Sequence, residues 1–325
     1  MTLIRTVGGF PNLWDGIVDS GAIANFQTIF NLLTAIVLVP FTGLLVKLSC
    51  AIVKDDAKQE DKYPELAVLD KKLMISPTLA LQGVTKAATA MIKAARENVG
   101  LSLEQYASYD EEKSEYINRH EERLDKFTDD ADNYLIQLSQ SIETDKDNRQ
   151  LNMLMQTIPN IERIGDYATN FDELALKLHE TGSNFSEGAQ KELRLLGDAI
   201  MEILRLTVEA IETDSDIVAR RIEPLEEVID DMVLLLRNRH TARLCQGVCS
   251  VNTGLIFMDS LTHLERAADQ CSSIAMLLLG RHNDAILKNH HQYLHDLHSS
   301  TDQSYLAEQE NRKQQYLAPL ENIQY

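Results

Sequence analysis

From residue 77 onward the chain contains an internal repeat. Residues 264–275 (LERAADQCSSIA) lie 103 positions after residues 161–172 (IERIGDYATNFD), and both stretches contain Glu-Arg-x-x-Asp. Upstream of each, EERLD at 121–125 corresponds to EEVID at 226–230, at an offset of 105 positions. The same pattern in the same order is typical of a structural unit present in two tandem copies.

Each copy is expected to form three amphipathic helices. Leu, Ile, Met and Ala recur at three- and four-residue spacings, which predicts long helices. Ser76 and Pro77 suit the cap and first position of the first helix, and residues 181–188 (TGSNFSEG) separate the copies. The predicted fold class is all-α, with two antiparallel three-helix bundles in tandem. The helices are expected at about 77–99, 110–142, 147–179, 187–213, 215–244 and 250–279.

An apolar stretch precedes the repeat. Residues 20–46 contain no charged side chain, and residues 29–46 (IFNLLTAIVLVPFTGLLV) are nearly all apolar. Roughly 20 such residues span a bilayer, so we expect an N-terminal transmembrane helix. A buried core helix or a signal anchor is the alternative, because Pro40 and Gly43 interrupt the run. Several lysines follow the stretch and only Arg5 precedes it, which favours a cytoplasmic location for the rest of the chain.

The repeat places carboxylates in pairs. Residues i and i+4 of a helix share a face, so each Glu-x-x-x-Asp sets two negative charges side by side. The sequence has seven such pairs, several times what random placement of 25 glutamates and 25 aspartates would produce. Four pairs correspond between the copies, and they supply the candidate metal ligands Glu121, Asp125, Glu162, Asp166, Glu226, Asp230, Glu265 and Asp269.

Two such pairs can meet within each copy if its second and third helices are antiparallel neighbours. Four carboxylates without cysteine or histidine form a hard oxygen site suited to Mg²⁺, Mn²⁺, Ca²⁺ or iron. The alternative is a solvated acidic face, on which Arg163 pairs with Asp166 and Arg266 with Asp269. The spacing leaves both interpretations open. A divalent or iron-type ion is the expected cofactor, with Mg, Mn, Fe and Zn all open.

Charge and missing motifs narrow the function. Fifty acidic and 31 basic residues give a formal charge of -19, which argues against a nucleic-acid partner. No glutamate has a histidine three residues later, as di-iron bundles need. The P-loop, the dinucleotide fingerprint, H-E-x-x-H and G-x-S-x-G are also absent, so we do not expect an enzyme.

Histidines gather near the end of the chain. Five of the nine fall between residues 282 and 298, and His291, His295 and His298 share a helical face. Two histidines at i and i+4 can chelate Zn²⁺ or Ni²⁺. A solvated polar face is the favoured interpretation.

Together these residues resemble the PhoU family, whose members consist of two three-helix bundles, carry Glu-x-x-x-Asp metal motifs and regulate phosphate uptake. The resemblance lies in the Glu-Arg-x-x-Asp helices, the helix EPLEEVIDDMVLLLRNRHTARL (223–244) and RKQQYLAPL (312–320). Residues 23–41 and 69–81 look like the last membrane segment and junction of bacterial sodium/phosphate cotransporters that end in a PhoU-like domain. The Gln-Ser-Ser-Ser signature of those transporters is absent, so we expect their C-terminal part, with the transport core truncated or encoded separately.

The resemblance implies a bacterial inner-membrane protein with a cytoplasmic C-terminal domain. It implies metal binding by the eight paired carboxylates, with Arg163 and Arg266 orienting them or meeting an anion such as phosphate. Inorganic phosphate and sodium would be partners through the transport core, alongside membrane lipid, and a homo-oligomer stays open. The alternative function is a membrane-tethered, metal-binding adaptor of phosphate signalling.

The expected domain boundaries follow from these observations. They are 1–53 for the membrane segment, 54–75 for a linker, 76–182 and 183–300 for the two three-helix units, and 301–325 for a C-terminal tail.

Overall fold

The computed structural model of the protein describes residues 20–39, 62–66, 69–281, 283, 286, 289–298 and 302–323. The chain forms two compact units, Met1–Lys62 and Tyr63–Tyr325. The described helix of the first unit is α2 (Ser20–Leu38), on which large apolar side chains such as Phe26 and Phe30 are exposed.

The transmembrane helix expected at residues 29–46 is not confirmed. Helix α2 ends at Leu38, and residues 40–46 lie outside the described part of the chain. Over the residues that the structure describes, no helix has both the length and the apolar character needed to cross a bilayer. Polar residues, among them Gln27 and Asn31, interrupt the apolar sequence of α2.

The first bundle consists of α4 (Pro77–Gln105), α5 (Glu111–Ser139) and α6 (Asp145–Glu180). Its helices occupy the predicted positions, except that α4 continues six residues further. Asp110 and Thr144 start α5 and α6 by accepting hydrogen bonds from backbone N–H groups of the first turn, which would otherwise lack partners. Pro77 occupies the first turn of α4 as predicted, but the Ser76 side chain makes no capping bond.

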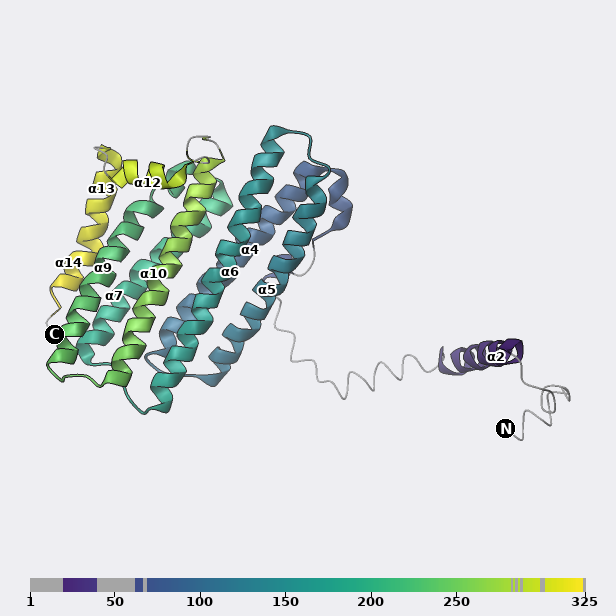
Figure 1. Ribbon diagram of the computed structural model, residues 1–325, viewed down its shortest axis with the longest axis horizontal. Helices are drawn as coiled ribbons and strands as arrows, with labels where there is room; N and C mark the ends of the chain where they lie inside the picture. Colours follow the sequence, from purple (N-terminus) through teal and green to yellow (C-terminus); the bar gives the residue numbers. More distant parts are fainter. Residues whose placement is uncertain are drawn as a thin grey trace. The chain divides into compact units, whose positions relative to one another are not determined.

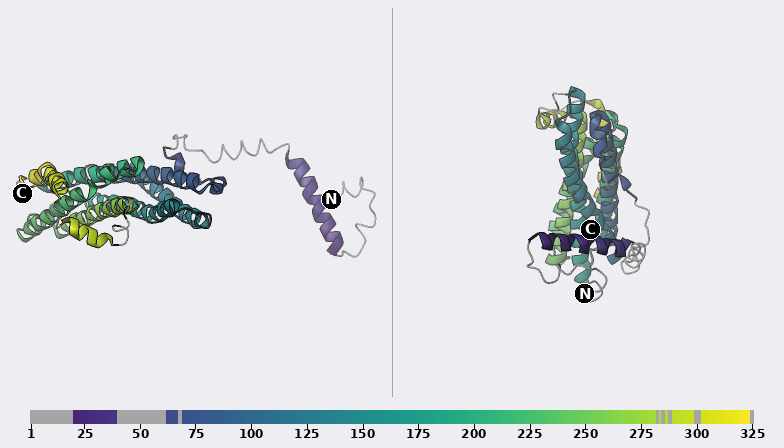
Figure 2. Two further views of the ribbon diagram at one scale, coloured as in Figure 1. Left: turned by 90° about the horizontal axis from the view of Figure 1, so that it is seen from above. Right: turned by 90° about the vertical axis from the view of Figure 1, so that its right-hand side faces the viewer.

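The second bundle consists of α7 (Glu187–Thr213), α9 (Ile222–Cys245) and α10 (Val251–Gly280). A short helix, α8 (Asp216–Ala219), precedes α9, so the helix expected over 215–244 is divided in two. The bundles pack against each other through α6 with α10 and α4 with α7. Figures 1 and 2 show their long helices side by side. For the described residues, the all-α prediction is confirmed.

Aromatic side chains join the two bundles in one core. The Tyr106 hydroxyl, at the end of α4, lies 2.7 Å from Ser260 Oγ of α10. Phe185, in the connection between the bundles, stacks on Tyr106 and packs edge-on against Phe257 of α10. The repeat units therefore form one body rather than two separate domains.

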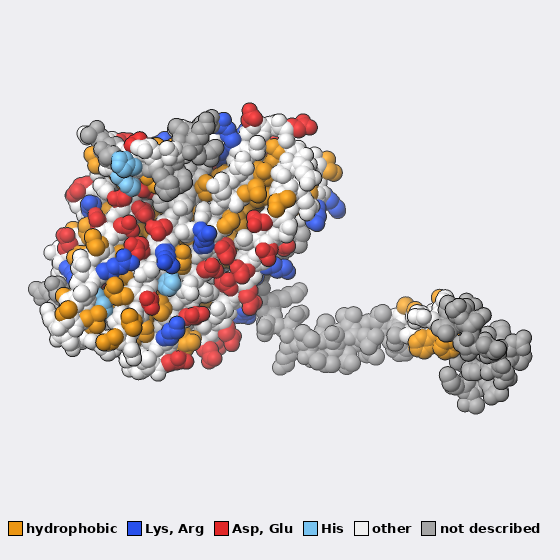
Figure 3. Space-filling model, in the orientation of Figure 1, with side chains coloured by type: hydrophobic (Ala, Val, Ile, Leu, Met, Phe, Trp, Pro, Cys, Tyr) orange, Lys and Arg blue, Asp and Glu red, His pale blue; other side chains and the backbone are white. Residues whose placement is uncertain are grey.

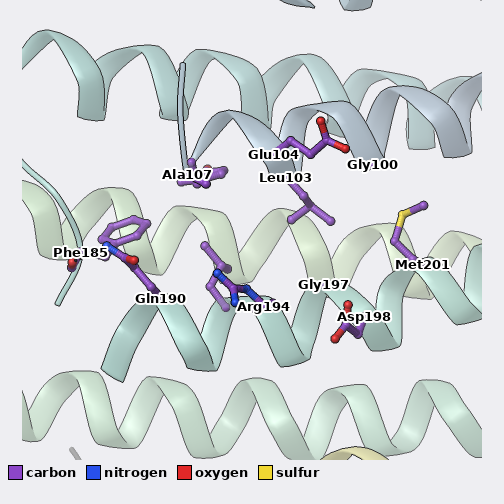
Figure 4. A pocket seen from close by; sticks show the side chains of 12 residues that line it. Gly100, Leu103, Glu104, Ala107, Phe185, Gln190, Arg194, Gly197, Asp198 and Met201 are labelled. Atoms are coloured by element: carbon purple, nitrogen blue, oxygen red, sulfur yellow. Dashed lines mark hydrogen bonds between the residues drawn. The ribbon is translucent and has the colours of Figure 1, made fainter. Parts of the chain in front are cut away.

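Small residues bring α4 and α7 together. A Cβ on Gly197 of α7 would lie 3.3 Å from Leu103 Cδ1 of α4, and one on Gly100 would lie 3.2 Å from Met201 Cε. A hollow of about 400 Å³ lies between these helices. Figure 4 shows Leu103 and Met201 among the side chains that line it. Two glycines thus hold the helices close without filling the space beside them.

After the second bundle the chain returns along α9. Helix α12 (His290–His298) is followed by α13 (Gln303–Arg312), η5 (Lys313–Leu317) and α14 (Ala318–Glu321). We call residues 303–321 the C-terminal arm. The arm packs on α9 and buries Tyr316 and Leu320. The apolar side chains explain this packing, because burying them is favourable.

Candidate functional site

Helices α5 and α6 bring the predicted carboxylates of the first copy together. Carboxylate oxygens of Glu121, Asp125 and Asp166 lie within 4.8 Å of one another. Burial, and then the charges of Asp125, Asp166 and Glu162, raises the pKa of Glu121 to about 7. Like charges this close favour the uptake of a proton or a cation. We call this group the first cluster.

Glu162 lies beside the first cluster, one turn before Asp166. Burial and the charges of Asp166 and Asp125 raise the pKa of Glu162 to about 7, and burial also raises the pKa of Asp166. Arg163 is exposed, and its positive charge opposes both shifts. All four candidate ligands of the first copy therefore lie in one place, with the predicted arginine near them.

Gly165 explains how the two helices come so close. A Cβ at this position would lie 2.8 Å from Cδ1 of Leu124, whose side chain is 1% exposed. Leu124 directly precedes Asp125 on α5, so the contact sets the distance between the two carboxylate pairs. The missing side chain at Gly165 thus lets α5 approach α6 closely.

The second copy forms a second cluster from Glu226, Asp230 and Asp269, whose oxygens also lie within 4.8 Å of one another. Burial, and then the charges of Glu223 and Asp230, raises the pKa of Glu226, which is 9% exposed. Burial and the charges of Asp269 and Glu265 raise the pKa of Asp230 to about 6. Burial also raises the pKa of Asp269.

Glu265, the fourth candidate ligand of the second copy, has a different partner. Its Oε2 lies 2.5 Å from Nη2 of Arg237 on α9, and its Oε1 accepts from Nη1 at 3.3 Å. Arg237 was missed at the sequence level, although it lies two helical turns after Asp230 on the same helix. The predicted Arg266 is exposed, and its charge opposes the raised pKa of Asp269. The two copies are therefore not equivalent.

Other Glu-x-x-x-Asp pairs take part in ordinary contacts. Glu212 forms an ion pair with Lys93 at 2.6 Å. Asp147 accepts hydrogen bonds from Thr144 and Thr78 near the start of α6. Spacing along one helix therefore does not create a cluster unless a neighbouring helix supplies further carboxylates.

A third group was not foreseen as a unit. Ligand atoms of Glu223, Glu227 and His298 lie within 4.8 Å of one another, and His298 comes from α12. Of the predicted histidine face, His298 contacts carboxylates, His295 is exposed, and the side chain of His291 lies outside the described residues. The i,i+4 spacing of Glu223 and Glu227 was a usable signal, but only the path of α12 brings a histidine to them.

The first and second clusters are open to solvent. Figure 3 shows acidic side chains gathered over α5 and α6 and over α9 and α10 on one face of the molecule. Asp125, Asp230 and Asp269 are exposed, so an ion can reach both clusters without a change in fold. Three carboxylates at this spacing offer the oxygen donors that hard cations prefer.

Comparison with known proteins agrees with this architecture. Residues 88–175 and 193–278 match the PhoU domain family. The chain is 24% identical over 292 residues to the putative inorganic phosphate export protein YjbB of Salmonella typhimurium, covering 86% of this chain and 52% of that protein. It is 29% identical over 136 residues to a phosphate-specific transport system accessory protein PhoU homolog of Synechocystis, covering 40% of this chain and 56% of that protein.

The chain spans about half the length of the curated relatives it matches. The match to the Salmonella protein covers 86% of the chain, a larger share than residues 63–325 make up. The match therefore includes residues before Tyr63.

Solved structures share the fold. The phosphate transport system regulatory protein PhoU from Streptococcus pneumoniae superposes with a TM-score of 0.58 at 20% identity, covering 64% of this chain and 98% of that chain. PhoU from Pseudomonas aeruginosa gives a TM-score of 0.60 at 16% identity, covering 65% and 99%. At 20% and 16% sequence identity, this similarity shows a shared fold only.

Proposed function

Because the chain belongs to the PhoU domain family, we propose that it is the regulatory part of a membrane phosphate carrier and acts by binding rather than by catalysis. The family match includes both copies of the repeat, at residues 88–175 and 193–278. Inorganic phosphate and sodium would be handled by a transport core, and the two bundles would respond to the state of that core.

The observation that carries this proposal is the extent of the match to the phosphate export protein. That match continues upstream of Tyr63, whereas the PhoU domain match begins at residue 88. The chain before Tyr63 also contains α2, which exposes Phe26, Ile29 and Phe30. Exposed apolar side chains in such a group favour contact with lipid or with other membrane helices. The segment before Tyr63 would attach the bundles to the cytoplasmic side of the inner membrane.

We also propose that the first cluster binds a divalent or iron-type cation. Glu121, Asp125 and Asp166 would hold the ion, with Glu162 beside them. The donor set supports this proposal, because three carboxylate oxygens lie within 4.8 Å and burial raises the pKa of Glu121 and Asp166. A bound ion would supply a positive charge that offsets the repulsion among these carboxylates.

The second cluster would bind a cation in the same way. Glu226, Asp230 and Asp269 would be the ligands, and Glu265 would stay with Arg237 or exchange that partner for the ion. In both copies an exposed arginine, Arg163 or Arg266, stands beside the carboxylates and could hold an anion such as phosphate near the metal.

A second candidate function is a membrane-tethered adaptor of phosphate signalling. The match to a PhoU homolog that is named an accessory protein favours it. The reading frame upstream distinguishes the two functions, because a carrier requires transport repeats with Gln-Ser-Ser-Ser and an adaptor requires none.

Phosphate flux in cells tests the proposal. Deleting the gene in its native host should change the uptake or efflux of radiolabelled phosphate, and the full chain should restore it. The variant Glu121→Gln/Asp125→Asn/Asp166→Asn should behave like the deletion, because the cation site is lost while side-chain shape is kept.

A matched control is available on the same helix. Glu111 and Glu115 are exposed and four residues apart on α5, so Glu111→Gln/Glu115→Gln removes charge outside the cluster and should restore normal flux. Equal flux in the deletion strain and its parent would contradict a role in phosphate transport. Full activity of the triple variant would contradict only the metal site.

A further inference from the structure

A histidine from outside the matched PhoU domain meets two glutamates of α9. His298 Nε2 lies 2.7 Å from Glu223 Oε1, and His298 Nδ1 lies 3.2 Å from Glu227 Oε1. Glu223 is 2% exposed and also accepts a hydrogen bond from Ser272 of α10. The imidazole ring thus lies between two carboxylates, one of which is buried.

A buried tyrosine completes this group. Tyr305 of α13 is 6% exposed, and its hydroxyl has no hydrogen-bond partner. Its ring stacks on His298 at a centroid distance of 6.2 Å. A buried polar group without a partner is unfavourable unless something else binds it.

We propose that Glu223, Glu227 and His298 form a third metal site, which takes a divalent transition-metal ion of the zinc class and is distinct from the two all-carboxylate clusters. Nδ1 of His298 and an oxygen of Glu227 bind the ion, and Glu223, which faces Nε2 in this structure, turns its carboxylate to supply the third oxygen. The Tyr305 ring packs beside this group. The inference does not depend on the proposed role in phosphate transport.

The chemistry and spacing of the donors set the class of ion. A nitrogen donor beside carboxylates suits Zn²⁺, Mn²⁺ or Fe²⁺, whereas Mg²⁺ prefers oxygen donors and retains its water. With bonds of about 2.0–2.2 Å, two ligands of one tetrahedral zinc ion lie roughly 3.4 Å apart. The 3.2 Å between His298 Nδ1 and Glu227 Oε1 is close to that value.

The site links parts of the chain that are far apart in sequence. Figure 1 shows α12 lying across the bundle near the start of α9, with α13 beside it. Glu223 and Tyr305 also line a cavity of about 360 Å³, which offers an ion access to the buried glutamate. A bound ion would fix α12 and the start of the C-terminal arm to α9.

Zinc binding to the full chain tests the site. Calorimetric titration of the parent chain with Zn²⁺, in excess Mg²⁺, should show one Zn²⁺ ion bound at this site. In His298→Ala this binding should be absent or at least about tenfold weaker. Tyr305→Phe, which removes the hydroxyl and keeps the shape of the ring, should weaken Zn²⁺ binding at the same site. On binding, the ring ¹⁵N resonance of His298 should shift as expected for a metal-bound nitrogen.

His295→Ala is the matched control, because His295 lies on the same helix with a side chain that is 76% exposed. This variant should bind Zn²⁺ like the parent. The proposal is wrong if His298→Ala keeps the parent stoichiometry and affinity, or if His295→Ala loses the equivalent instead. If His298→Ala does not fold, as judged by circular dichroism, Glu227→Gln provides the same test without altering α12. The proposal is also wrong if the parent chain binds Zn²⁺ only at its two all-carboxylate clusters.

Discussion

At the scale of single residues, the first cluster holds charges where they oppose folding. Glu121 and Glu162 have pKa values of about 7, above the ordinary value of 4.5. Burial is the main cause, and the neighbouring aspartates add to it. Above pH 7 both groups are ionised in the folded protein and oppose folding, and this opposition is lost as the pH falls through 7 toward 4.5.

We therefore expect the thermal midpoint of the full chain in EDTA to rise as the pH is lowered from about 8 to about 6. The folded protein binds protons that the unfolded chain does not bind in this range, so its free energy of unfolding increases. Differential scanning calorimetry across the range measures the effect, which should shrink in Glu121→Gln/Glu162→Gln. Glu111→Gln/Glu115→Gln should keep the parent profile, and a flat profile for the parent would contradict the pKa assignments.

At the scale of helices, the approach of α5 to α6 decides whether the carboxylate pairs meet. The contact rests on Gly165 and Leu124, because a Cβ on the glycine would lie 2.8 Å from the leucine Cδ1. Leu124 is buried and has little room to move aside. Any side chain at residue 165 therefore pushes the two helices apart.

Gly165→Ala should lower the free energy of unfolding by about 1–3 kcal/mol, because overpacking a buried contact is unfavourable. Urea unfolding followed by circular dichroism measures this change. Gly83→Ala is the control within α4: its Cβ would lie 3.7 Å from Leu73 Cδ1, an ordinary contact. It should stabilise the protein by about 0.5–1 kcal/mol, since alanine favours helix over glycine. Equal effects of the two substitutions would contradict the packing argument.

Much of the helical structure could be predicted from the sequence, because helix periodicity and helix start signals are local. The bounds of α5, α6, α7 and α10 depend on such signals. The meeting of Glu121 with Asp166 was expected for another reason, because a short turn makes their two helices antiparallel neighbours. The partner of Glu265 could not be predicted, since Arg237 competes for it only after α9 and α10 pack. The third group depends on the return of α12, and the burial of Leu320 depends on α9, so both required the tertiary structure.

At the scale of the whole molecule, a buried charge network fastens the C-terminal arm. Glu192 of α7 is fully buried and forms ion pairs with Arg239 at 3.3 Å and Arg243 at 2.8 Å. Arg239 also donates to the carbonyl oxygens of Leu320 and Glu321 at 2.8 and 2.9 Å. One carboxylate therefore compensates two guanidinium groups, one of which holds the end of the arm.

Glu192→Gln should lower the free energy of unfolding by about 3–5 kcal/mol, because it leaves two buried positive charges without a counter-charge. Amide hydrogen exchange in the C-terminal arm should rise by more than exchange in α5. Glu187→Gln, at an exposed position of the same helix, should change stability by less than about 0.5 kcal/mol. A small effect of Glu192→Gln would show that water or another group already compensates the arginines.

The tandem order of the bundles has a consequence for synthesis on the ribosome. The first bundle is complete at Glu180, when α10 has not yet been translated. Tyr106 and Phe171, which later contact Ser260 and His263, have no partner bundle at that stage. Translation adds roughly 5–20 residues per second, so this delay lasts several seconds. During that interval the nascent chain presents an apolar face of the kind that chaperones bind.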